Sequence, residues 1–256
     1  MVIEMIEENI VLKRNGIKLS GMLFTPEGKM RYPAVIIAHG LPSTPTPVQE
    51  KGYDVLGRNI CALGAIAIIF NFSGCRGSDG FYSIKNELKD LDLVWNYIWK
   101  LPQIDISRIG FLAFSAGTIP TIYFVANREK SPKTRPKLVI IGACPADLSG
   151  VKLSELRVGI QLANQSGNIR LQKGSEADII KELEEFMPIK WISLISIPKY
   201  IVHGAKDRLI DVENAYQLYK HAIDPKELII LDAADHQLRQ DAGAMQKILS
   251  IIKNKL

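Results

Sequence analysis

Six short runs in which consecutive residues are apolar constrain the fold of this chain more than any other feature. A strand that is buried on both faces has apolar residues at every position, and such strands are typical of parallel sheets that helices cover on both sides. Segments with the apolar spacing of helices lie between the runs. The alternation therefore predicts an α/β fold with a mostly parallel, doubly wound sheet. The runs cover residues 34–38, 65–70, 109–114, 138–141, 200–202 and 228–231.

The segment that follows residue 84 illustrates the expected helices. Leu88, Leu91 and Trp95 recur at helical spacing and form its apolar face. Glu87 and Asp90 are expected to lie off that face.

An antiparallel hairpin is expected before the first run of the parallel sheet. Asn15-Gly16 separates residues 10–13 from residues 17–24, and this dipeptide readily takes the type I′ turn that joins two strands. The hairpin then precedes the alternating strands and helices.

The stretch over about 150–197 departs from the alternation, because it contains no strand-like run and is far longer than an ordinary loop. A helix is predicted over 176–186 and a turn over 165–168. We therefore predict a single domain over residues 1–256, with a small, mostly helical cap inserted at about 150–197.

Composition excludes several classes of protein. The 256 residues are 47% hydrophobic and 23% charged, which is ordinary for a globular protein. The net charge of +5 comes from dispersed basic residues, so no patch for nucleic acid is expected. No segment approaches the roughly 18 apolar residues that span a bilayer, and the first residues do not form a signal peptide. The cysteines Cys61, Cys75 and Cys144 show no metal-ligand spacing, and we expect a cytoplasmic protein with reduced thiols.

The most informative segment is Ala113-Phe114-Ser115-Ala116-Gly117, which follows an apolar run directly. A serine between a strand and a helix can occupy a sharp turn that exposes its hydroxyl as a nucleophile. Small residues are needed on either side because the strand and the helix pass close together. Gly117 meets this need, and Ala113 replaces the more common glycine. The alternative is that Ser115 only caps the following helix.

A serine hydroxyl needs a base to remove its proton and an acid to orient that base. After an elbow of this kind the acid and then the histidine follow along the chain, in loops at the ends of strands. Asp207 follows the run that ends at residue 202, and His236 follows the run that ends at residue 231. Asp147 is the alternative acid, because it follows an earlier run, whereas Asp211 is expected to cap a helix.

The negative charge that develops on a substrate oxygen needs two fixed N–H donors. The amide of Ala116 is one candidate, since it follows the nucleophile directly. The amide of Leu41 is the other, because the neighbouring Pro42 has no N–H. His39 precedes this loop and is expected to hold its shape instead of acting as a base.

Taken together, these segments resemble the α/β-hydrolase superfamily, and most closely its dienelactone-hydrolase and acyl-peptidase-like esterases. The resemblance covers nearly the whole chain and implies the triad Ser115, Asp207 and His236, with the amides of Leu41 and Ala116 as the oxyanion hole. It implies neither a metal nor an organic cofactor. The matching segments are His39-Gly40, 71–80, 113–117, 204–207 and Asp235-His236.

The loop over 71–80 departs from the pattern of the superfamily. Ser73 stands where arginine is common, and Arg76 stands where glycine is usual. Cys75 lies in the same loop and is a weaker candidate nucleophile, because no elbow surrounds it.

The resemblance implies hydrolysis of a small acyl substrate, and we expect a carboxylic ester. A peptidase, amidase or thioesterase of the same fold is the alternative, since fold alone does not choose among them. A non-catalytic binding protein of this fold is the alternative from another class.

Overall fold

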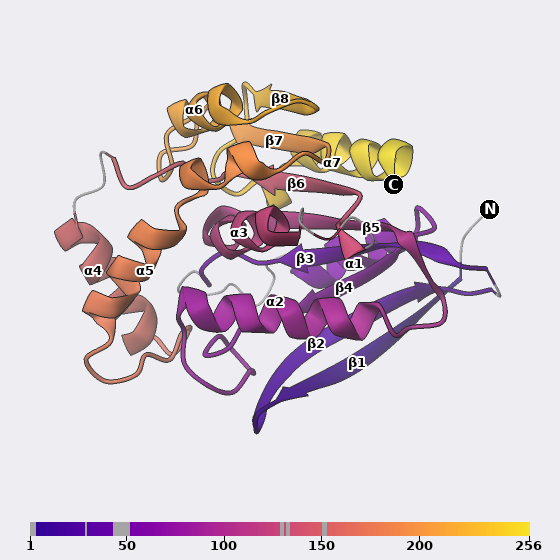
Figure 1. Ribbon diagram of the computed structural model, residues 1–256, viewed down its shortest axis with the longest axis horizontal. Helices are drawn as coiled ribbons and strands as arrows, with labels where there is room; N and C mark the ends of the chain where they lie inside the picture. Colours follow the sequence, from indigo (N-terminus) through magenta and orange to yellow (C-terminus); the bar gives the residue numbers. More distant parts are fainter. Residues whose placement is uncertain (1–3, 29, 43–51, 129–130, 132–133, 150–152) are drawn as a thin grey trace.

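The chain forms one mixed sheet, in which the parallel strands are flanked on one side by an antiparallel hairpin (Figure 1). This computed structural model describes residues 4–28, 30–42, 52–128, 131, 134–149 and 153–256. The strand order is β1-β2-β4-β3-β5-β6-β7-β8, and β4 onward is parallel. This architecture confirms the predicted α/β class. The strands are β1 (Met5–Arg14), β2 (Ile17–Pro26), β3 (Tyr32–Ala38), β4 (Ile66–Phe70), β5 (Ile104–Phe114), β6 (Leu138–Gly142), β7 (Lys199–Gly204) and β8 (Lys226–Leu231).

The hairpin of β1 and β2 forms around the expected turn. Asn15 and Gly16 both have positive φ, at 45° and 79°, as a type I′ turn requires. Both strands are longer than expected, because their antiparallel pairing continues from Arg14 and Ile17 at the turn to Met5 and Pro26 at the far end. β2 then pairs antiparallel with β4 and attaches the hairpin to the parallel strands.

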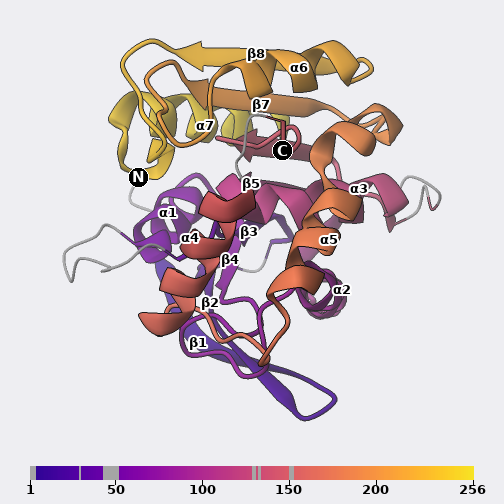
Figure 2. The same cartoon turned by 90° about the vertical axis from the view of Figure 1, so that its left-hand side faces the viewer.

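Helices cover both faces of the sheet, as Figures 1 and 2 show. Successive residues of a strand point to opposite faces, so Ile36 packs in one buried cluster with α2 and α3, and Ile37 in another with α1 and α7. Both faces of β3 are therefore apolar, which explains the uninterrupted run in the sequence. The helices are α1 (Tyr53–Cys61), α2 (Ile84–Ile98), α3 (Thr118–Arg128), α4 (Leu153–Gln165), α5 (Glu176–Phe186), α6 (Glu213–His221) and α7 (Ala242–Lys255).

One expectation for α2 was wrong. Glu87 and Asp90 do not lie in an exposed position away from the apolar face but are buried, with 3% and 0% of their surface exposed. Asp90 is buried because Arg14 and Ser73 surround its carboxylate. Burial raises the pKa of Glu87 well above its usual range, and the neighbouring carboxylate of Asp90 adds to this rise.

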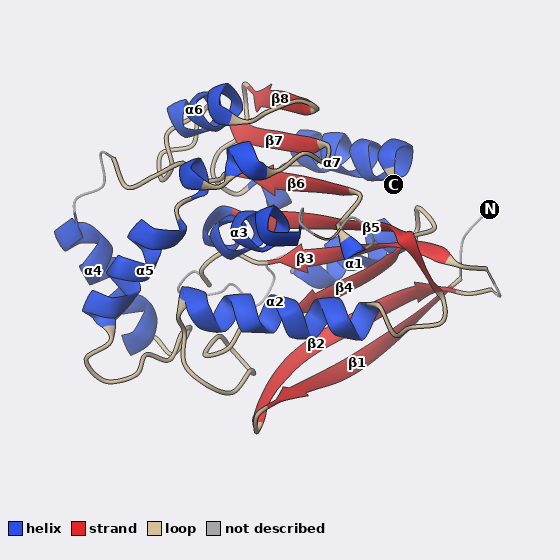
Figure 3. Ribbon diagram, in the orientation of Figure 1, coloured by secondary structure: helices blue, strands red, loops and turns tan. Residues whose placement is uncertain are grey.

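The region between β6 and β7 is mostly helical, with α4 and α5 standing beyond the carboxyl ends of the parallel strands (Figures 1 and 3). The turn after α4 pairs with the loop after β4. The amide of Arg170 donates to the Gly74 carbonyl at 2.6 Å, and the amide of Tyr82 donates to the Arg170 carbonyl at 2.8 Å. Two segments that are far apart in the sequence are thereby fixed beside the same edge of the sheet. In the described part of the chain, no helix is long and apolar enough to cross a membrane.

Candidate active site

Ser115 lies in a sharp turn between β5 and α3. Its φ is 50°, in the left-handed region that residues with a side chain rarely adopt. Gly117 permits this turn, because a Cβ at that position would lie 2.2 Å from the carbonyl oxygen of His39. Backbone strain of this kind is the geometry of a nucleophile elbow and not of an ordinary helix cap.

His236 connects Ser115 with Asp207. Its Nε2 lies 3.0 Å from the Oγ of Ser115, and its Nδ1 lies 2.8 Å from the Oδ2 of Asp207. A carboxylate only accepts hydrogen bonds, so Nδ1 carries the proton in this arrangement and Nε2 is free to accept the serine proton. The structure thus brings together three side chains that are far apart in the sequence. Ser115 precedes His236 by 121 residues, and Asp207 precedes it by 29.

Asp207 is held as a carboxylate. Burial alone would raise its pKa, but hydrogen bonds from His203, His236 and the amide of Ile210 outweigh burial and hold the pKa well below its usual range. The Oδ1 atom accepts from the amides of Leu209 and Ile210, each at 2.9 Å. An ionised acid in this position stabilises a positive charge on His236.

The loops that carry Asp207 and His236 are joined to each other. A Cβ at Gly204 would lie 2.4 Å from the carbonyl oxygen of Ala234, so the two loops approach closely at this glycine. The amide of Ala205 donates to the Leu231 carbonyl at 2.9 Å, and that of Lys206 donates to the Ala234 carbonyl at 3.0 Å. Asp207 and His236 are therefore positioned by one connected piece of backbone.

The other candidate residues lie in different surroundings. Asp147 accepts from the amide of Ser149 at 2.7 Å, in the segment that leads toward α4. Asp211 accepts from the amide of Glu213, the first residue of α6, at 2.8 Å, although the N-cap position of this helix is Val212 and not Asp211 as expected. Burial raises the pKa of the Cys75 thiol, which disfavours the reactive thiolate.

His39 holds the loop after β3 in place, as expected. Its Nδ1 lies 2.7 Å from the Gly40 carbonyl oxygen, and its Nε2 accepts from the amide of Phe72 at 3.0 Å. Burial lowers the pKa of His39 to about 4, so the ring is neutral at pH 7. With both ring nitrogens occupied, His39 is not available as a base.

The loop after β3 passes directly beside Ser115. A Cβ at Gly40 would lie 2.9 Å from the Cβ of Ser115 and 3.5 Å from its Oγ. The amide of Gly40 donates to the hydroxyl of Tyr53 at 3.3 Å, a residue that the sequence did not single out. The Leu41 amide makes no hydrogen bond with the residues that the structure describes, and the Ala116 amide lies in the first turn of a helix, where N–H groups lack helical partners. The oxyanion hole of Leu41 and Ala116 stays a prediction.

An arginine from another part of the chain, Arg14, contacts the loop after β4. Arg14, at the end of β1, donates from Nε to Asp90 at 2.7 Å and from Nη2 to the Oγ of Ser73 at 3.1 Å. The amide of Ser73 donates to the same carboxylate at 2.7 Å. Arg14 therefore supports this loop from the hairpin, although Ser73 occupies the position where arginine is common. Arg76 has a φ of 45°, which a glycine at this position would adopt without strain.

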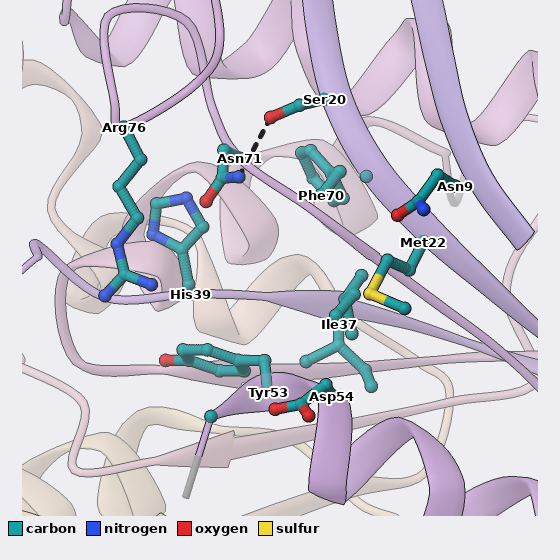
Figure 4. A pocket seen from close by; sticks show the side chains of 13 residues that line it. Asn9, Ser20, Met22, Ile37, His39, Tyr53, Asp54, Phe70, Asn71 and Arg76 are labelled. Atoms are coloured by element: carbon teal, nitrogen blue, oxygen red, sulfur yellow. Dashed lines mark hydrogen bonds between the residues drawn. The ribbon is translucent and has the colours of Figure 1, made fainter. Parts of the chain in front are cut away.

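A cavity of about 330 Å³ lies beside the loop that carries His39. Figure 4 shows His39, Tyr53 and Arg76 around it, with apolar side chains from the sheet on the other side. Its lining is mixed, because Asn71 and Asn9 contribute amides while Met22 contributes an apolar surface. His39 and Tyr53 both line this cavity and contact Gly40, whereas Ser115 and His236 are not among its lining residues.

Three large apolar side chains between β6 and β7 have different environments. Met187 is buried in the main core, and the ring of Trp191 packs against that of Tyr123, with centroids 4.6 Å apart. Leu162 on α4 is 55% exposed. Among the described residues, no three His, Cys, Asp or Glu side chains gather in a way that could hold a metal ion.

The fold defined by this sheet, its flanking helices and the serine elbow is the α/β-hydrolase fold. No protein-family model matches the chain, and no curated protein matches it in sequence. Solved structures resemble it strongly in shape.

Three of these structures illustrate the resemblance. The 2,6-dihydroxy-pseudo-oxynicotine hydrolase superposes with a TM-score of 0.73 at 18% identity, over 97% of this chain and 68% of that one. The esterase domain of a Rhodothermus marinus protein gives a TM-score of 0.69 at 18% identity, over 97% of both chains. Est1E from Butyrivibrio proteoclasticus, solved with ferulic acid, gives a TM-score of 0.72 at 17% identity, over 95% of this chain and 96% of that one. Identities this low establish the shared fold alone.

Proposed function

We propose that this protein is a serine hydrolase that cleaves carboxylic esters through an acyl-enzyme intermediate. The observation that carries the proposal is the continuous hydrogen-bonded series from Asp207 through His236 to Ser115. A nucleophile, a general base and an orienting acid in this order are the components that acyl transfer requires.

The first half of the reaction forms the acyl-enzyme. The Oγ of Ser115 attacks the ester carbonyl carbon while Nε2 of His236 accepts the hydroxyl proton. The amides of Leu41 and Ala116 donate to the oxyanion of the tetrahedral intermediate. His236 then returns the proton to the leaving alcohol, and the C–O bond of the ester breaks.

The second half repeats these steps with water. His236 takes a proton from water, the resulting hydroxide attacks the acyl carbon, and the carboxylic acid leaves as Ser115 recovers its proton. Asp207 stays ionised throughout and stabilises the positively charged ring of His236. In this proposal the segment over about 150–197 caps the site, because α4 and α5 stand beyond the strand ends that carry the triad (Figure 2).

The test is the variant Ser115→Ala with a p-nitrophenyl ester as substrate. We expect a loss of activity of about 10⁴-fold or more, with the thermal unfolding midpoint preserved. Ser250→Ala is the matched control, since Ser250 lies exposed on α7. Wild-type turnover in Ser115→Ala would contradict the proposal, as would failure of a fluorophosphonate probe to label Ser115 in the folded wild-type protein.

The choice among esters, thioesters and amides needs a comparison of rates. A short-chain ester, an acyl-CoA and an aminoacyl anilide should be tested side by side, because each of them would acylate the same serine. Est1E was solved with ferulic acid, and therefore esters of aromatic acids belong in the panel of substrates. We expect the short-chain ester to react fastest.

A further inference from the structure

His203 lies at the carboxyl end of β7, four residues before the acid of the proposed triad. Its side chain is fully buried, with 0% of the surface exposed. We propose that His203 is a positioning residue, which fixes the carboxylate of Asp207 so that its Oδ2 faces His236. The inference rests on the proposed function.

The ring of His203 contacts both ends of the turn that contains Asp207. Its Nε2 lies 2.8 Å from the carbonyl oxygen of Ile210 and 3.3 Å from the Oδ2 of Asp207. A carbonyl and a carboxylate are both acceptors, so Nε2 must carry the proton that they share. One N–H of His203 therefore links the start and the end of the turn over 207–210.

The other ring nitrogen fixes the charge of His203. Nδ1 is buried and has no hydrogen-bond partner among the residues that the structure describes. A proton on this atom would be a buried donor without an acceptor, which is costly. His203 is thus a neutral donor in one tautomer. It supplies geometry to Asp207 without adding a positive charge that would compete with His236.

With His203 included, donors approach both oxygens of the carboxylate. The amides of Leu209 and Ile210 hold Oδ1 at 2.9 Å, while His236 and His203 approach Oδ2 at 2.8 Å and 3.3 Å. Donors on both sides restrict rotation of the carboxylate about its Cβ–Cγ bond. If the His203 donor is lost, the carboxylate of Asp207 can rotate more freely. Its Oδ2 then accepts a hydrogen bond from His236 alone.

This geometry predicts two effects of losing the donor. The rate falls, because His236 is oriented less well toward Ser115. The acid limb of the pH profile of kcat/KM moves to higher pH, because a carboxylate with fewer donors attracts the proton on His236 more strongly. A residue that only fills space in the core would produce neither a shift of this limb nor recovery by a donor of similar length.

The experiment compares His203→Leu with His203→Gln in the full chain, with p-nitrophenyl acetate as substrate from pH 5 to 9. Leucine removes the donor, whereas the amide of glutamine can replace it at a similar reach. For His203→Leu we expect kcat to fall by about 10- to 100-fold, KM to change less than threefold, and the acid limb to move upward by about half a pH unit or more. His203→Gln should recover most of kcat and return the limb toward the wild-type position. His221→Gln is the control, because His221 is exposed on α6.

Several outcomes would overturn the inference. One is that the acid limb of the pH profile of kcat/KM lies at the same pH in His203→Leu as in the wild type. This outcome counts whether kcat is unchanged or falls only in proportion to the fraction of folded protein. Another is an equal loss in the Leu and Gln variants. If His203→Leu does not fold, His203→Met replaces it, since methionine adapts to irregular core sites. Nitrogen NMR of the wild-type protein gives a test that needs no variant, because an Nε2 of His203 without a proton would exclude the proposed donor.

Failure of the proposed function is distinguishable from failure of this inference. A wild-type protein whose Ser115 is not acylated refutes the function. If Ser115 of the wild-type protein is acylated normally but His203→Leu leaves the acid limb of the pH profile unchanged, only the role of His203 is refuted.

Discussion

Replacing Gly117 by alanine is the most direct test of the elbow geometry. The added Cβ would lie 2.2 Å from the His39 carbonyl oxygen and 3.1 Å from that of Ala38. A carbon and a carbonyl oxygen in contact are normally separated by about 3.3 Å or more. The backbone of His39 must therefore retreat by about 1 Å, because neither oxygen belongs to a flexible side chain.

That displacement affects activity more than stability. Overpacking of this size costs about 1–3 kcal/mol, which corresponds to a fall in the unfolding midpoint of roughly 2–12 °C for a chain of this length. His39 continues into Gly40 and Leu41, so the proposed oxyanion donor moves with it. A misplacement of about 1 Å in a catalytic group can cost about 100-fold in rate, and we expect a loss of that order in Gly117→Ala.

The assay measures ester hydrolysis and the thermal midpoint for Gly117→Ala beside Gly159→Ala. Gly159 lies in α4, and a Cβ there meets nothing within 4 Å. The control should keep its rate and gain up to about 1 kcal/mol of stability from the better helix propensity of alanine. If Gly117→Ala keeps its rate within threefold of the wild type, the loop after β3 adapts freely and the reasoning is wrong.

Two further predictions concern the residues that hold this loop. His39 has a folded-state pKa of about 4, below its unfolded value, so its contribution to the free energy of unfolding is complete above about pH 6.5 and is lost as the pH falls toward 4. Between pH 6.5 and pH 4 the free energy of unfolding of the wild type should fall by about 3 kcal/mol because of this group. In urea denaturation at several pH values, the free energy of unfolding of His39→Gln should depend less on pH than that of the wild type. An equal dependence on pH in the two proteins would contradict the assignment. Tyr53→Phe removes the acceptor of the Gly40 amide and should lower kcat by about fivefold with little change in the thermal midpoint, and an unchanged kcat would show that this bond does not position the loop.

Local patterns in the sequence were sufficient to predict the sheet and the central elbow. Each apolar run lies within a strand, apart from Ala65 at the start of one run, and in β3 to β7 burial on both faces explains the continuous signal. Ser115, Asp207 and His236 each directly follow or lie a few residues beyond such a run, and parallel strands place their carboxyl ends at one edge. The proximity of the three residues therefore followed from strand order alone.

Contacts between distant segments could not be predicted in this way. Arg14 meets Asp90 only because β1 and α2 pack beside each other in the folded chain. Asp90 and Glu87 looked like surface residues because their burial depends on those neighbours. Tyr53 gives no signal in the sequence, since an aromatic residue at the start of a helix is most often part of the core.

The close joining of the loops that carry Asp207 and His236 has a consequence for how the proposed activity would be lost. β8 is an edge strand whose residues are only partly buried, whereas every residue of β7 is buried. Separation of β8 from β7 would remove His236 from Ser115 while the central strands stay paired. Under mild denaturant, catalysis would then report on the integrity of this one edge and disappear before the chain as a whole unfolds.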